Sequence, residues 1–168
     1  MRTDHYYEIG FRVIDPEDSA LLEKWYAMTD QFGYATGFKS FSEVRQSLMP
    51  SINQYSVASM ILIPGRNEAA GFVFAELKNL DRITVLWIHI IIIDPEFQGK
   101  GLGTCVVNRL LNYAKSQGAA ASVVSVSEHN KRGIHFWEKL GFGHSAILEE
   151  SLNTIGQTGV AIMKRILP

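Results

Sequence analysis

The stretch that decides the fold runs from residue 83 to residue 104 and reads Ile83-Thr84-Val85-Leu86-Trp87-Ile88-His89-Ile90-Ile91-Ile92-Ile93-Asp94-Pro95-Glu96-Phe97-Gln98-Gly99-Lys100-Gly101-Leu102-Gly103-Thr104. Residues 83–93 are almost continuously apolar and β-branched, which is typical of a central strand buried on both faces. A buried helix is the competing interpretation, but four successive isoleucines followed by Asp94-Pro95 favour a strand. A turn with three glycines follows it.

The glycine turn, residues 98–104, opens the most clearly patterned helix of the chain, predicted over residues 102–117. Gly118 is placed to end that helix. Glycines let a backbone approach a ligand closely, and the N–H groups of a helix's first turn attract phosphate. The turn therefore predicts a pyrophosphate site, to which Lys100 adds a positive charge.

Three other interpretations of the glycine turn fit less well. Three alternating glycines at a helix start cost stability, so a turn that only reverses the chain does not explain them. The dinucleotide fingerprint Gly-x-Gly-x-x-Gly fails because Thr104 stands where the third glycine belongs. The phosphate loop of nucleoside triphosphatases fails because Gly101, not Ser or Thr, follows Gly99-Lys100.

Two segments of the chain resemble the GNAT superfamily of N-acetyltransferases. Residues 98–103 match the signature Arg/Gln-x-x-Gly-x-Gly/Ala, and Ile93-Asp94-Pro95 is similar to the family's Val-x-Pro lead-in. Residues 130–142, Asn-Lys-Arg-Gly-Ile-His-Phe-Trp-Glu-Lys-Leu-Gly-Phe, are similar to the family's Asn-x-x-Ala-x-x-Phe-Tyr-Glu-Lys-Leu-Gly-Phe. Together the motifs cover about residues 83–142, whereas the first 80 residues agree in element order only.

The resemblance implies an α/β (α+β) fold with a twisted mixed sheet of about six to seven strands flanked by helices. Strands four and five are expected to splay apart and form the cleft for acetyl-CoA. Backbone groups of Ile91 and Ile93 would pair with the pantetheine arm like an added strand. The cofactor-binding residues implied in this way are Ile91, Ile93, Gln98, Gly99, Lys100, Gly101, Leu102, Gly103, Thr104, Asn130 and Phe136.

Two departures from the family pattern concern catalysis. Many members carry a glutamate where this chain has His89, and a histidine can take a proton directly or through water. Without the resemblance, His89 is a core histidine satisfied by one hydrogen bond. Members often place a proton-donating tyrosine where Trp137 stands, and Gly133 replaces their alanine. An indole N–H is no practical proton source, so Trp137 is expected to pack against the cofactor arm.

The rest of the chain predicts a mixed α/β sheet rather than a regular βαβ array. A first helix is capped by Asp15 and a second by Ser40, with Glu43 as its capping-box partner. Phe32, Tyr34 and Phe38 either line the acceptor pocket or seal the core. The other predicted elements are strands over residues 6–13, 57–63, 70–77, 122–127, 144–148 and 160–166, and a helix over 130–140.

Length and composition indicate a single domain over residues 1–168 with an ordinary core, since 46% of the residues are apolar. The net charge of −1, with basic residues scattered, predicts no nucleic-acid or membrane partner. The five histidines show no spacing that predicts a metal site. One cysteine, Cys105, and a polar start without a signal-peptide pattern predict a cytoplasmic protein.

The function expected from the resemblance is acetylation of an amine by acetyl-CoA, by direct attack in a ternary complex. A covalent intermediate is not expected, because Cys105 lies inside the phosphate-binding helix. A non-catalytic acyl-CoA-binding module is the main alternative, and a nucleotide-binding Rossmann-type domain is a third. The identity of the acceptor amine stays open, as does the choice between a monomer and a homodimer.

Overall fold

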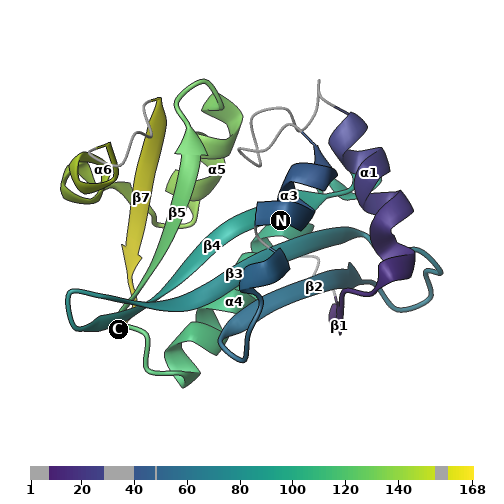
Figure 1. Cartoon of the computed structure of the whole chain (residues 1–168), viewed down its shortest axis with the longest axis horizontal. Coiled ribbons are helices and arrows are strands. Elements are labelled where there is room, and N and C mark those ends of the chain that lie inside the picture. Colours follow the sequence, from purple (N-terminus) through teal and green to yellow (C-terminus); the bar gives the residue numbers. More distant parts are fainter. Residues whose placement is uncertain (1–7, 29–39, 48, 154–158) are drawn as a thin grey trace, which may run out of the picture.

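The computed structural model describes residues 8–28, 40–47, 49–153 and 159–168. Within these residues, seven strands form one mixed sheet in the order β1-β2-β3-β4-β5-β7-β6 (Figure 1). Strands β4 and β5 pair in parallel, and every other neighbouring pair is antiparallel. The predicted mixed α/β sheet flanked by helices is confirmed.

The bounds of the elements agree with most of the predicted ranges. The strands are β1 (Gly10–Val13), β2 (Ser56–Leu62), β3 (Gly71–Leu80), β4 (Ile83–Ile93), β5 (Ala121–Ser127), β6 (Gly143–His144) and β7 (Val160–Ile166). The helices are α1 (Ser19–Ala27), α3 (Phe41–Ser47), α4 (Leu102–Ser116), α5 (Lys131–Lys139) and α6 (Ala146–Asn153). Short 3-10 turns are η1 (Pro16–Asp18), η2 (Met49–Ser51) and η3 (Pro95–Phe97). Phe32, Tyr34 and Phe38 lie outside the described residues.

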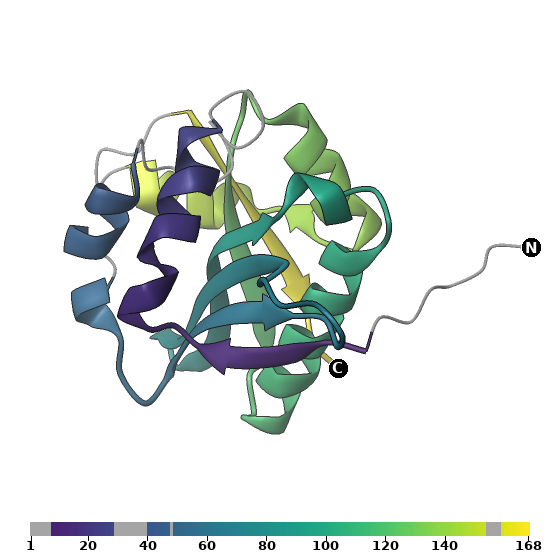
Figure 2. The same cartoon turned by 90° about the vertical axis from the view of Figure 1, so that its right-hand side faces the viewer.

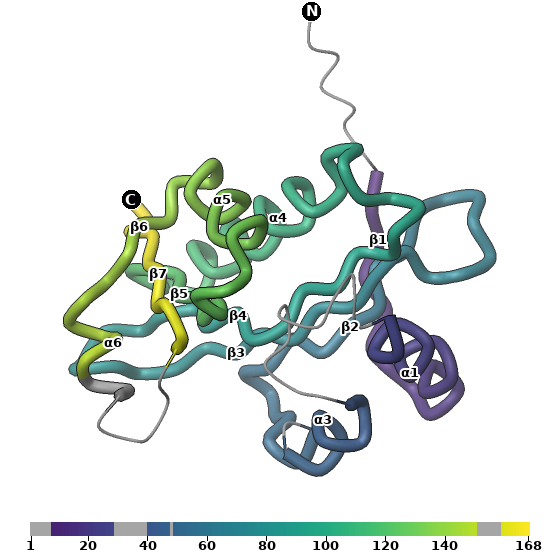
Figure 3. Tube along the Cα trace, turned by 90° about the horizontal axis from the view of Figure 1, so that it is seen from above, coloured from purple at the N-terminus to yellow at the C-terminus, as the bar shows by residue number. Residues whose placement is uncertain are grey.

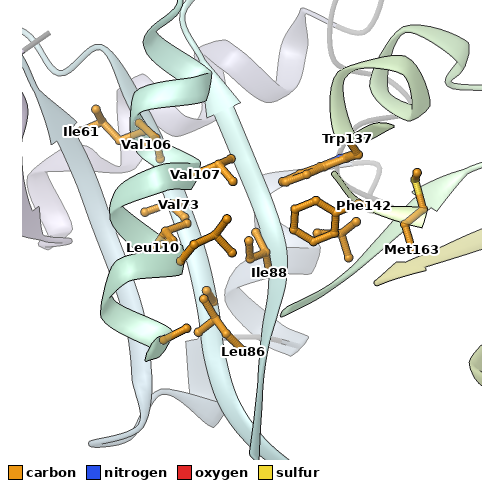
Figure 4. Packing of buried hydrophobic residues seen from close by; sticks show 14 of the residues in the cluster. Ile61, Val73, Leu86, Ile88, Val106, Val107, Leu110, Trp137, Phe142 and Met163 are labelled. Carbon is orange, nitrogen blue, oxygen red and sulfur yellow. The ribbon is translucent and has the colours of Figure 1, made fainter. Parts of the chain in front are cut away.

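Helices cover both faces of the sheet. Helices α4 and α5 lie on one face, and α1 and α3 lie on the other (Figures 2 and 3). Val106, Val107 and Leu110 of α4 are directed at the sheet, as Figure 4 shows, and belong to the larger buried cluster. A second buried cluster joins Leu22 and Trp25 of α1 to the opposite face. The sheet is therefore the middle layer of three.

Both predicted helix caps are present. The side chain of Asp15 accepts a hydrogen bond from the Glu17 N–H at 2.8 Å, and Asp18 accepts one from the Asp15 N–H at 2.9 Å. Arg12 of β1 donates to Asp18 at 2.7 Å, which ties the turn to the first strand. Ser40 Oγ accepts from the Glu43 N–H at 3.3 Å. Asp15 thus caps the 3-10 turn η1 that leads directly into α1, and Ser40 caps α3 where the sequence predicts.

Strand β4 contains a bulge that decides which side chains face the two helical layers. Phe74 of β3 lies opposite Ile90, whereas the next residue, Ala75, lies opposite Ile88, so His89 is the extra residue. Ile88 packs in the cluster under α4, whereas Ile90 packs in the cluster under α1. A bulge reverses the alternation in this way. The expectation that β4 is buried on both faces is wrong at Ile83, which is exposed, and at His89, Ile91 and Ile93, which like Thr84 and Trp87 are only partly buried.

The predicted strand over residues 144–148 is wrong beyond its first residue. Strand β6 ends at His144, and α6 begins at Ala146. The Ser145 N–H still donates to the Ile162 carbonyl of β7 at 2.8 Å, and the Ser145 carbonyl then accepts from the Glu149 N–H at 3.0 Å. Residues 146–150, Ala-Ile-Leu-Glu-Glu, are mostly good helix formers, and their helical propensity prevails over the strand suggested by the short apolar run 146–148.

Candidate active site

A cleft opens where β4 and β5 separate. The two strands pair only from Val85 and Ala121 to Ile88 and Val124, although β4 continues to Ile93 and β5 to Ser127. Figure 1 shows the two strands diverging beyond this point. A cavity of about 400 Å³ lies there, lined by residues of both strands, the glycine turn and helix α5. The splayed fourth and fifth strands expected from the sequence are therefore present.

The glycine turn forms one wall of the cavity. Gly99 and Gly101 have φ angles of 72° and 87°, a left-handed conformation that residues with a side chain rarely adopt. No atom would lie within 4 Å of a Cβ at either position. The Gln98 side chain donates to the Ile93 carbonyl at 2.8 Å and so fastens the turn to the end of β4. The turn thus presents the start of α4 to open space, which suits an anion.

The opposite wall is the start of α5. Asn130 caps this helix, because its side-chain oxygen accepts from the Gly133 N–H at 2.8 Å. A Cβ on Gly133 would lie 2.4 Å from the Asn130 amide nitrogen, so glycine at this position leaves room for the cap. The ring of Trp137 meets those of Phe136 and Phe142 edge to face, each at 5.0 Å between centroids. Figure 4 shows Trp137 and Phe142 next to Ile88 of β4.

The structure brings most of the predicted site residues to this one cavity. Its lining includes His89, Ile91, Ile93, Gln98, Gly99, Gly101, Gly103, Thr104, Asn130, Phe136 and Trp137. Lys100 and Leu102 are not part of the lining. Lys100 is exposed, and the Leu102 side chain is fully buried in the cluster beneath α4. A helical turn places neighbouring residues on different faces, so a continuous stretch cannot all face a ligand.

Several lining residues were not predicted from the sequence. Phe97 and Ser125 add an aromatic ring and a hydroxyl group, and Arg132 and Lys139 add two positive charges on α5. Both basic residues lie inside the matched motif over residues 130–142. Arg132 stands at a position that the motif leaves open, and Lys139 stands at the motif's lysine. Their helical spacing from Asn130 and Phe136 is the signal that would have found them.

His89 lies at the point where the two strands separate. Its Nε2 atom is 2.7 Å from Oε1 of Glu76 on β3, and its side chain is 18% exposed. The ring stacks on Trp87 at 5.8 Å with 9° between the planes. Lys78 Nζ contacts the same Glu76 oxygen at 2.8 Å. Glu76 and Lys78 could not be predicted from the sequence, because their place beside His89 depends on the β3–β4 register and on the bulge.

The protonation of this cluster follows from its burial. Burial lowers the pKa of His89 below its ordinary value, and the hydrogen bond and charge of Glu76 oppose this only in part. Burial acts to raise the pKa of Glu76, but the hydrogen bonds from Lys78 and His89 outweigh it and hold that pKa below its ordinary value. At neutral pH, His89 is therefore neutral and Glu76 is ionised, so the imidazole is able to accept a proton.

In the part of the chain that the structure describes, no three His, Cys, Asp or Glu side chains gather closely enough to hold a metal ion. No helix of the described segments combines the length and the apolar character that crossing a membrane requires.

Comparison with known proteins places residues 21–142 in a model described as the acetyltransferase (GNAT) family. An uncharacterized N-acetyltransferase from Methanocaldococcus jannaschii is 33% identical over 88 residues, which are 51% of this chain and 39% of that protein. An L-amino acid N-acyltransferase from Escherichia coli is 29% identical over 69 residues, which are 41% of this chain and 40% of that protein. The chain thus spans about two fifths of the length of these curated relatives.

Solved structures share the fold over nearly the whole chain. A domain from Methanocaldococcus jannaschii superposes with a TM-score of 0.73 at 23% identity, covering 96% of this chain and 99% of that one. A spermidine N-acetyltransferase from Vibrio cholerae, solved in complex with CoA and spermine, gives a TM-score of 0.68 at 20% identity, covering 95% of each chain.

Proposed function

Because the chain belongs to the GNAT family of acetyltransferases, we propose that it moves an acetyl group from acetyl-CoA to an amine by direct attack in a ternary complex. The observation that carries this proposal is the cavity between β4 and β5, which has the glycine turn and the start of α4 in one wall. Turnover of acetyl-CoA with a panel of amines tests it.

The shape and charge of the cavity support one placement of the cofactor. The pyrophosphate would meet the N–H groups of residues 99–104, at the positive end of α4. Beyond Ile88, the edge of β4 that faces β5 pairs with no strand of the described residues, so the main chain of Ile91 and the N–H of Ile93, whose carbonyl accepts from Gln98, are placed to pair with the pantetheine arm on that side. Arg132 and Lys139 supply positive charge to the remaining phosphate oxygens.

The residues of the cavity suit a single displacement. The neutral amine forms an N–C bond with the thioester carbonyl, the C–S bond breaks, and its electron pair leaves with the CoA thiolate. A main-chain N–H of the unpaired β4 edge meets the oxyanion that forms between these events. His89, neutral at physiological pH, takes the proton that the amine loses. Asn130 and Phe136 hold the arm that carries the thioester.

The acceptor class rests on the names of similar proteins. One neighbour in structure is named a spermidine N-acetyltransferase, and relatives in sequence are named mycothiol acetyltransferases. We infer an amine-bearing acceptor and leave its identity open. The rival function, a non-catalytic acyl-CoA-binding module, is favoured by Trp137 in place of a proton-donating tyrosine.

Substitutions of Trp137 distinguish a packing role of this side chain from a chemical role. Its side chain is 9% exposed and lies edge to face between two phenylalanines, so we expect it to shape the wall for the pantetheine arm. A thiolate has a reference pKa of about 8.5, so its departure near neutral pH needs no dedicated acid. Trp137→Phe should therefore keep kcat within about tenfold, whereas Trp137→Ala should chiefly raise the KM for acetyl-CoA.

Steady-state kinetics at saturating amine measures both effects. Trp137→Ala leaves a cavity in the core, so its unfolding must be checked in parallel, and Trp137→Phe serves as the variant that preserves packing. Loss of turnover in Trp137→Phe with acetyl-CoA binding intact would mean that the indole N–H makes a bond that the transition state requires.

A further inference from the structure

The position of His89 is set by the bulge rather than by regular pairing. As the extra residue of β4, His89 lies opposite no residue of β3 in the strand pairing. The pairing of β4 with β5 ends one residue before it, at Ile88. A bulge turns its side chain out of the regular alternation. The orientation of the ring therefore depends on side-chain contacts.

Among the residues that the structure describes, Trp87, Phe74 and Glu76 make these contacts, and of the three Glu76 alone touches a ring nitrogen. Trp87 stacks on the imidazole, and Phe74 lies against it at 5.4 Å between centroids. These two rings set the plane of the imidazole but leave either nitrogen free to carry the hydrogen. Oε1 of Glu76 on β3 lies 2.7 Å from Nε2, and the Glu76 side chain is 13% exposed.

The Glu76 contact selects one tautomer of His89. An ionised carboxylate only accepts hydrogen bonds, so the Nε2 atom of a neutral imidazole beside it must carry the hydrogen, and the lone pair lies on Nδ1. We propose that Glu76 is a positioning residue, which holds His89 as the Nε2–H form so that Nδ1 accepts the proton of the attacking amine. This inference deepens the proposed function and rests on it.

The step is balanced without any further reactant. The amine lone pair forms the N–C bond, the N–H proton moves to Nδ1 of His89, and the C–S electron pair leaves with the thiolate. Glu76 stays ionised throughout and stabilises the imidazolium across the Nε2–H bond. The proton on Nδ1 then returns to the thiolate or to solvent.

Lys78 balances the charge of Glu76. Its ammonium group lies 2.8 Å from the same carboxylate oxygen and 5.3 Å from the centre of the Trp87 ring. Glu76 acts to raise the pKa of His89, and Lys78 acts to lower it. Glu76 and Lys78 are not part of the cavity lining. The charged side chains that line the cavity with His89 are Arg132 and Lys139 of α5. Lys78 thus keeps Glu76 ionised while His89 stays neutral.

The tautomer is measured directly by long-range ¹H–¹⁵N correlation of the imidazoles in the free protein, which needs no substrate. Wild type should show His89 with hydrogen on Nε2 near neutral pH, and Glu76→Leu should show a mixture of tautomers or the Nδ1–H form. Finding wild-type His89 as the Nδ1–H form, or unchanged in Glu76→Leu, would overturn the proposal.

The pH dependence of kcat/KM separates positioning from a merely structural role. Glu76→Gln removes the negative charge, so the rising limb should move to lower pH and kcat should fall on the order of 10- to 100-fold. Lys78→Met removes the positive charge, so the limb should move to higher pH. Rates are compared with wild type on the same amine, because the titration of the amine itself then cancels. Shifts in the same direction, or no shift in either variant, would contradict the proposal.

A second histidine–glutamate pair provides the matched control. His144 Nε2 contacts Glu149 Oε2, and neither residue lines the cavity. Glu149→Gln should leave kcat and the pH profile unchanged. If the nitrogen spectra show the Nε2–H form but no amine is acetylated, the tautomer assignment stands and the catalytic role falls with the proposed function.

Discussion

Gly101→Val is expected to weaken acetyl-CoA binding on the order of 100-fold in Kd. Gly101 has a φ of 87°, which a β-branched residue avoids, and its Cβ side faces open space beside the start of α4. A valine there must either shift the turn or occupy the space that the pyrophosphate approaches. Hydrogen bonds to a charged group contribute about 1.5–3 kcal/mol each, so losing one or two of them accounts for this change.

The opposite end of α4 supplies the control for strain alone. Gly118 has a φ of 74°, and no atom lies within 4 Å of a Cβ built there, but Gly118 does not line the cavity. Gly118→Val should lower the melting temperature as Gly101→Val does and should bind acetyl-CoA like wild type. Calorimetry on both variants decides the placement: if Gly101→Val binds as tightly as wild type, the pyrophosphate does not lie at this turn.

His89→Ala is expected to lower kcat/KM by about 10²- to 10⁴-fold, the usual contribution of a general base. Burial lowers the pKa of His89 below 6.5, and the imidazole accepts a proton only when neutral. The wild-type kcat/KM should therefore rise with pH through the lowered pKa of His89. Near pH 7 it should no longer depend on the titration of His89. In the variant this rising limb should disappear, leaving only the titration of the amine.

His135→Ala is the matched histidine control, because His135 lies on the exposed side of α5 and outside the cavity lining. It should keep the wild-type rate and profile. A His89→Ala variant with wild-type kcat and an unchanged profile would mean that solvent or the substrate supplies the base, and that His89 is only a packed histidine.

The parts of the fold with long, strong patterns could be predicted from the sequence. Strand β4 and helix α4 agree with their apolar patterns almost to the residue, because the strand is a nearly unbroken apolar run and the helix buries one continuous face. Helix α6 could not be predicted in the same way. It has eight residues, and the short apolar run in residues 144–148 fits a strand equally well until the edge of β7 away from β5 is seen to pair with a strand of only Gly143 and His144.

The site was predictable where one local segment builds it. The glycine turn and the cap of α5 are each built by one continuous segment, so a sequence motif is enough to predict each of them. Glu76 and Lys78 reach His89 only through the β3–β4 pairing and its single bulge, and a shift of one residue would send both to the other face. No spacing in the sequence specifies such a shift.

The central claim is acetyl transfer to an amine, and acetyl-CoA turnover tests it most directly. Purified protein is incubated with acetyl-CoA and, separately, with a polyamine, free amino acids, a peptide with a free N-terminus and an aminoglycoside, while thiol release and product mass are followed. We expect one free thiol for each N-acetylated product with at least one of these amines, and a strongly reduced rate in His89→Ala. Saturable acetyl-CoA binding with no thiol release above the enzyme-free rate for every amine would contradict the claim and would identify a non-catalytic acyl-CoA-binding module.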